Sequence, residues 1–141
     1  MGLTLTNDNQ EIELIIKGYQ FPQLTKYFSD NNWLTLSCRS ITDDKTICGE
    51  FPCFMTMELQ RLQVLLEQFQ SGVLASVSWN GTEPNFSITL HENRLLNIFF
   101  DAENGDSIVT FCKYATVQDV KNLIIFCAES SKLYPVREFG L

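Results

Sequence analysis

Residues 56–70 read TMELQRLQVLLEQFQ, and this stretch decides the fold class. Its apolar residues recur at intervals of three and four, which is the periodicity of one helical face: Leu59, Leu62, Leu65, Leu66 and Phe69. Thr56 is a preferred N-cap residue, Glu58 places a carboxylate in the first turn, and Gly72 follows as a stop. The pattern predicts an amphipathic helix over about 57–70, with its apolar face on a sheet.

The residues before this helix alternate between apolar and polar side chains, as half-buried strands do. Glu11–Lys17 predicts one strand, which ends at Gly18-Tyr-Gln-Phe-Pro22 because proline cannot donate to a strand ladder. Trp33–Cys38 predicts a second strand, and Thr46–Phe54 predicts its return in a hairpin. Three strands are therefore expected before the helix.

Four more strands are predicted after the helix, because alternating segments are separated there by turn residues. These strands are Ala75–Trp79, Asn85–Leu90, Leu95–Asp101 and Ser107–Ala115. Asn80-Gly81 is a strong turn signal between the first two. Leu95–Asp101 is so rich in apolar residues that it is interpreted as a central strand covered on both faces.

A second helix closes the pattern. Thr116-Val-Gln-Asp119 is a capping box with Asp in place of the usual Glu, and an apolar stripe predicts a helix over about 117–133, ending before Pro135. The order βββαββββα predicts an α+β fold: one twisted, mainly antiparallel sheet of about six to seven strands with two amphipathic helices. We expect a single domain over residues 1–141, with the helices on one main face of the sheet.

The charge balance narrows the classes of partner. Ten Lys and Arg face 17 Asp and Glu, which gives a net charge of −7, and there is no basic run. Direct binding of nucleic acid or of an anionic membrane is not expected, because both need clustered cations. A basic protein partner would be attracted, although solubility alone is the simpler explanation of the charge. The N-terminus has neither a positive region nor an apolar core typical of a secretory signal, so we expect a cytoplasmic protein.

Few residues suggest enzyme chemistry. The five cysteines form no CxxC pair and His91 is the single histidine, so we expect free thiols, no metal and no cofactor. The sequence has no phosphate loop, nucleophile elbow, zinc-protease motif or dinucleotide fingerprint. A small hydrolase that pairs His91 with Cys53 or a carboxylate is the less favoured alternative, because no motif fixes such a pair. We do not expect an enzyme.

Carboxylates gather at predicted turns: Asp43, Asp44, Glu92, Asp101, Glu103 and Asp106. Solvated turns are the simpler interpretation of this pattern. The functional interpretation is an acidic rim for a cationic partner.

Four short motifs follow one another along the chain: Gly18-Tyr-Gln-Phe-Pro22, Asn32-Trp-Leu34, Cys53-Phe with Thr56-x-Glu-Leu59, and Glu83-Pro-Asn-Phe86. Together they resemble the WapI-type immunity proteins of bacterial polymorphic, contact-dependent toxin systems. The motifs span about residues 11–90, and the later strands and last helix are similar in pattern.

The resemblance implies a cytoplasmic protein that binds the C-terminal toxin domain of a contact-delivered cell-wall protein. Such toxins are often nucleases, and binding would block them by steric and electrostatic means. A nuclease binds polyanions and is expected to be basic, which suits an acidic partner. The expected rim residues are Asp43, Asp44, Asp101, Glu103 and Asp106. A scaffold domain with a non-toxin partner remains an alternative, and the choice between monomer and homodimer is open.

Overall fold

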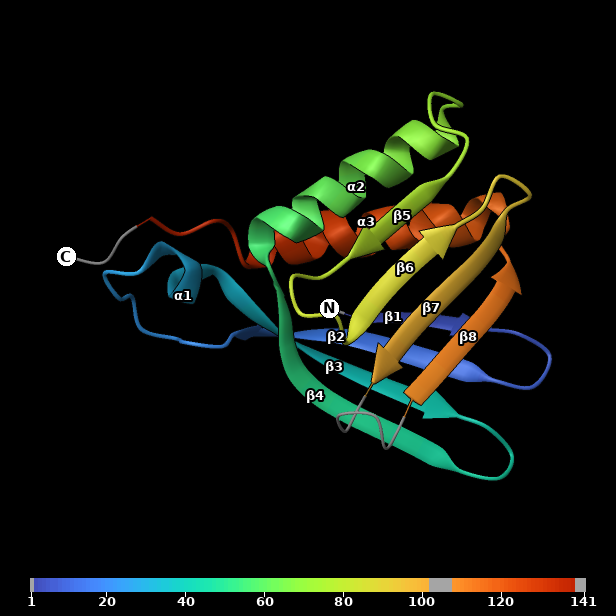
Figure 1. Ribbon diagram of the computed structural model, residues 1–141, viewed down its shortest axis with the longest axis horizontal. Helices are drawn as coiled ribbons and strands as arrows, with labels where there is room; N and C mark the ends of the chain where they lie inside the picture. The colour runs from blue at the N-terminus through green and yellow to red at the C-terminus, as the bar shows by residue number, and fades with distance from the viewer. Residues whose placement is uncertain (1, 102–107, 139–141) are drawn as a thin grey trace.

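The computed structural model describes residues 2–101 and 108–138, and Figure 1 shows two antiparallel sheets with helices beside them. Sheet A contains β1 (Gly2–Thr6), β2 (Glu11–Tyr19), β3 (Trp33–Ile41) and β4 (Thr46–Met55). Sheet B contains β5 (Val77–Asn80), β6 (Phe86–Leu90), β7 (Leu95–Asp101) and β8 (Ile108–Tyr114). The helices of the described residues are α1 (Phe28–Asn32), α2 (Thr56–Gln70) and α3 (Val117–Leu133).

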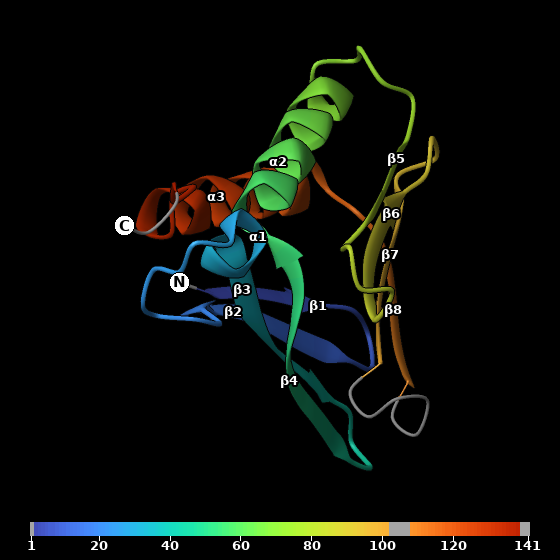
Figure 2. The same cartoon turned by 60° about the vertical axis from the view of Figure 1, so that its left-hand side comes forward.

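Strands that are consecutive in the chain are neighbours within each sheet, and every pair is antiparallel. α2 follows β4 and leads the chain from sheet A to the first strand of sheet B. α3 follows β8 and packs against α2 and, less extensively, against β1. The two sheets and the helix pair therefore form three sides around one shared hydrophobic core (Figures 1 and 2).

One face of each sheet packs against this core and the other face points outward. Buried and more exposed residues therefore alternate along the strands. In β7 the buried residues are Leu96, Ile98 and Phe100, and the residues between them are partly exposed. Figure 2 shows sheet B nearly edge-on, with the helices on one side. The prediction that β7 is covered on both faces is therefore wrong for the described residues. It arose because Phe99 points outward and makes the apolar run look continuous.

The predicted α+β class with antiparallel pairing is confirmed, and the strands are divided between two sheets rather than placed in one. The division follows from α2, because β4 and β5 lie at opposite ends of this helix and do not pair. β1 was not predicted: it pairs with β2 along the whole of Gly2–Thr6 and buries Leu3 and Leu5. The residues just before Trp33 form the short helix α1.

α3 has the predicted limits and the predicted cap. Thr116 Oγ1 accepts a hydrogen bond from the Asp119 amide at 3.0 Å, and Asp119 Oδ2 accepts one from the Thr116 amide at 2.8 Å. The capping box is therefore confirmed, and it satisfies two amides at the helix start. In the described part of the chain no helix is both long and apolar enough to cross a membrane.

α2 begins one residue earlier than predicted. Met55, and not Thr56, is its N-cap residue, and the carboxylate of Glu58 accepts a hydrogen bond from the Met55 amide at 2.7 Å. Thr56 instead donates its hydroxyl proton to Tyr134 O at 3.0 Å, which joins the start of α2 to the C-terminal segment. The helix ends at Gln70 as predicted.

Candidate functional site

The C-terminal segment, residues 134–138, lies against the connection between β2 and β3. Asn32 holds the backbone of Arg137 at two points: Asn32 Nδ2 donates to Arg137 O at 2.9 Å, and the Arg137 amide donates to Asn32 Oδ1 at 2.7 Å. Asn31 Nδ2 donates to Glu138 O at 3.0 Å. Both asparagine side chains are fully buried and cannot bind solvent water. These hydrogen bonds therefore satisfy polar groups that would otherwise be left without a partner.

The side chain of Arg137 completes this junction. Its Nε donates to Asn31 O at 2.7 Å, and its two terminal nitrogens donate to Phe21 O at 2.7 Å and Pro22 O at 3.0 Å. Its guanidinium carbon lies 3.6 Å from the ring centroid of Tyr19. The first two sequence motifs therefore hold Arg137 against the connection between β2 and β3.

A second junction joins the turn after β5 to the start of α2. A Cβ atom at Gly81 would lie 2.4 Å from Cys53 O, so no side chain fits there. The Glu83 amide donates to Cys53 O at 3.1 Å, and Trp79 Nε1 donates to Glu58 O at 3.0 Å. The remaining two motifs thus meet at one point, where they fix sheet B on sheet A.

Residues of all four motifs take part in these two junctions, so the motifs act in holding the fold together. A family model described as the immunity protein WapI-like family matches residues 3–134. This chain belongs to the WapI-like immunity protein family. No curated protein and no solved structure matches the chain significantly. The family match reaches from β1 to the end of α3, beyond the range of the short motifs.

The WapI-like chain does not bring His91 and Cys53 together. Cys53 is completely buried in sheet A, and burial raises the pKa of its thiol, which keeps it protonated and unreactive. His91 is exposed at the end of β6, where its Nε2 lies 3.0 Å from Asn97 Nδ2. Cys112 donates its thiol proton to the same amide group, at Asn97 Oδ1. Asn97 therefore lies between Cys112 and His91. The imidazole is not hydrogen-bonded to the thiol and is not placed to act as its base.

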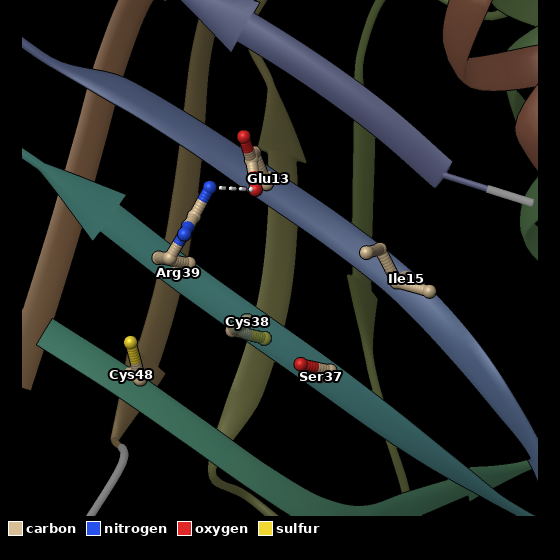
Figure 3. A pocket seen from close by; sticks show the side chains of 6 residues that line it. All are labelled: Glu13, Ile15, Ser37, Cys38, Arg39 and Cys48. Atoms are coloured by element: carbon tan, nitrogen blue, oxygen red, sulfur yellow. Dashed lines mark ion pairs between the residues drawn. The ribbon is translucent and has the colours of Figure 1, made fainter.

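A hollow of about 280 Å³ lies on the outer face of sheet A, across β2, β3 and β4 (Figure 3). Arg39 and Glu13, directly opposite each other on neighbouring strands, form an ion pair of 2.8 Å there. Their charges balance each other, and the other residues at the hollow are Ile15, Ser37, Cys48 and Cys38, whose side chain is buried in the core. In the described residues no group of His, Cys, Asp and Glu is placed to hold a metal ion. The hollow offers no set of groups for catalysis.

The predicted acidic rim falls at one end of the molecule. Asp43 and Asp44 are exposed in the turn between β3 and β4, and Asp101 ends β7. Both views place that turn and that end of β7 at the same lower end (Figures 1 and 2). Glu103 and Asp106 lie outside the described residues. Contact of the rim with a partner stays a prediction.

Sequence reasoning did not single out the outer face of sheet B, which is the side turned away from the helices (Figure 2). One cross-strand row on this face is Ser78, Thr89, Asn97 and Cys112. The next row is Asn80, Ser87, Phe99 and Thr110. Ile108 and Tyr114 lie at the two ends of β8 and are 56% and 67% exposed. The alternation of β8 was visible in the sequence, but which side the helices would cover was not.

Proposed function

We propose that this chain neutralises a cognate toxin domain by binding it, and that the block is steric and electrostatic. Membership of the WapI-like immunity family carries the immunity function against a toxin. The further proposal is that the toxin is a basic nuclease delivered by cell contact, and that the complex forms in the cytoplasm. The net charge of −7 supports the basic character of the toxin, since an acidic protein complements a surface that binds phosphates.

The acidic rim is proposed to steer this association. Asp43 and Asp44 are exposed in a hairpin turn at the same end of the molecule as Asp101. Carboxylates exposed in this way act mainly on the association rate, and salt screens their effect. The rim therefore raises the association rate and orients the approaching toxin domain. Other contacts, made in the bound complex, must keep its dissociation slow.

The test is coexpression with the C-terminal domain of a large secreted protein encoded next to this chain. We expect cells that express the toxin domain alone to die, cells that also express this chain to survive, and the two proteins to form a stable one-to-one complex. A complex without rescue would favour the alternative of an interaction domain with a non-toxin role. Cleavage of RNA or DNA by the isolated toxin domain, and its loss in the complex, tests the nuclease proposal separately.

The rim is tested by stopped-flow association with the double variant D43K/D44K. The control is E67K/E138K, which makes the same charge change at exposed positions on α2 and at the C-terminal segment. We expect D43K/D44K to associate about tenfold more slowly at low salt and to show a flatter salt dependence. Equal rates and salt slopes for the two double variants would show that this turn does not steer the partner.

A further inference from the structure

We infer that the outer face of sheet B is the surface that holds the toxin domain, and that it receives a basic patch of that domain. The inference rests on the proposed function and adds the place of contact. Its first support is exposure: the helices cover only the other side of this sheet, and no described segment lies over the outer side (Figure 2).

The second support is the distribution of cations. The outer face of sheet B carries no Lys or Arg among its described residues. The two cations near this sheet, Arg94 and Lys113, turn the other way. Arg94 lies 5.4 Å from the ring centroid of Phe69 in α2 and donates to Ala115 O, and Lys113 pairs with Asp119 of α3 at 3.1 Å. A basic partner therefore meets no like charge on this face.

The outer face of sheet A differs in this respect. Arg39 is half exposed there and forms an ion pair with Glu13, and Lys17 is exposed on the same strand as Glu13. Glu13 balances the charge of Arg39, and Glu11 and Glu50 also lie on this face, so sheet A presents both signs of charge to a partner. The two faces therefore differ in one respect: among the described residues, only the outer face of sheet B is free of cations that a basic patch would meet.

The third support is the kind of side chain on sheet B. Phe99 lies among amides and hydroxyls, and Tyr114 and Ile108 stand exposed along the edge strand β8. Rigid aromatics surrounded by small polar groups supply contact area and adaptable hydrogen bonds, as in protein-binding surfaces. A merely solvated edge strand is normally protected by lysine or another charge, and β8 has no exposed charge on this face.

A hollow of about 460 Å³ lies beside this face, between the turn after β1 and the end of β8. Asp8 and Tyr114 both line it, so a carboxylate and an aromatic ring are available to one entering side chain. Lys113 also lines the hollow, but its ammonium group is held by Asp119. This combination suits the guanidinium or ammonium group of a partner Arg or Lys.

A second copy of this chain is the other possible occupant of the face. Two chains of net charge −7 repel each other, and the faces of both copies would lack the cations needed to offset that repulsion. The acidic turn at Asp43 and Asp44 belongs to sheet A and lies at the same lower end of the molecule as the end of β7, so it is part of the acidic rim and not of this face (Figures 1 and 2).

The experiment measures the dissociation constant of the toxin domain for two pairs of variants. Thr110→Lys places a cation on the outer face of sheet B, and Thr4→Lys makes the same change on an exposed edge-strand threonine of sheet A. Tyr114→Ala removes the exposed ring beside the hollow, and Tyr27→Ala removes another exposed tyrosine, just before α1. Each substituted side chain is exposed, so circular dichroism should show four folded proteins.

We expect Thr110→Lys and Tyr114→Ala each to weaken binding at least ~10-fold, and each control to stay within about twofold of the wild type. Binding by the wild type with no loss in either sheet B variant would overturn the inference and leave the immunity function standing. Equal losses in variants and controls would also overturn it. If the wild type itself does not bind the toxin domain, the proposed function fails first. A wild-type dimer that Thr110→Lys dissociates, with toxin binding unchanged, would assign the face to a second copy.

Discussion

Replacing Arg137 with alanine should lower the free energy of unfolding by about 3 kcal/mol. The guanidinium group donates three hydrogen bonds to backbone carbonyls and lies over the ring of Tyr19. It is the point at which the last described residues of the chain are tied to the connection between β2 and β3. Its removal leaves the backbone bonds between Arg137 and Asn32 in place, so the predicted loss comes from the side chain alone.

The magnitude follows from how far each contact is removed from water. The partly buried bond from Nε to Asn31 O at 2.7 Å is a charge-assisted bond that contributes about 1.5 kcal/mol. The two bonds from the terminal nitrogens are exposed and contribute about 0.5 kcal/mol each. Contact with the Tyr19 ring adds about 0.5–1 kcal/mol. For 141 residues the entropy of unfolding is about 0.3 kcal/mol per degree, so Tm should fall by roughly 10 °C.

Thermal and urea unfolding of Arg137→Ala, Arg137→Lys and Lys132→Ala test this account. Lys132 is an exposed cation in the last turn of α3, so its removal controls for the loss of one positive charge and should change Tm little. Lysine at position 137 keeps the charge but not the planar fork, so most of the stability should still be lost. If Arg137→Ala unfolds within about 2 °C of Lys132→Ala, the side chain does not anchor the segment and the reasoning is refuted.

Two further predictions concern ionisable groups. Cys48 and Cys112 should be the only thiols that a water-soluble reagent modifies quickly in the native protein, with all five modified in denaturant, because burial shields the others and raises the pKa of Cys127 to about 12. Fast modification of a third thiol would contradict the described burial. Burial tends to raise the pKa of Asp119, but hydrogen bonds from Thr116 and Lys113 outweigh it and hold the pKa below its ordinary value. Its stabilising effect is therefore present above the unfolded pKa of about 4 and lost as pH falls through the folded pKa, so Asp119→Asn should cost more stability at pH 7 than at pH 3 in urea unfolding. An equal cost at both pH values would argue against this.

The elements that the sequence predicted well are those set by local pattern. α3 has the predicted limits because its apolar stripe and its capping box lie within one stretch of chain. β1 was missed because a five-residue stretch is too short for its own pattern to indicate a strand. Its strand conformation depends on pairing with β2, and Leu3 and Leu5 are buried in the folded chain. The division into two sheets was also beyond local pattern, since it depends on α2 packing against α3 rather than across one large sheet.

The candidate surfaces show the same limit. Net charge and turn carboxylates predict a basic partner without knowledge of the fold, and that stays a prediction. Arg137 and Asn31 are 106 positions apart in the sequence, so the local sequence around either residue does not predict their contact. The cation-free face of sheet B likewise depends on where Arg94 and Lys113 turn, and α2 and α3 decide this by covering the other side.

This arrangement separates what holds the fold from what is available for recognition. The family motifs are used in two junctions, one around Arg137 and one around Gly81, both turned toward other parts of the chain. The outer face of sheet B contributes to neither junction, and Ile108, Thr110 and Tyr114 on β8 are exposed. Exposed substitutions away from core contacts change stability by about 0.5 kcal/mol or less. If the outer face of sheet B holds the toxin domain as inferred, changes at Thr110 or Tyr114 would alter toxin binding while the scaffold stays the same.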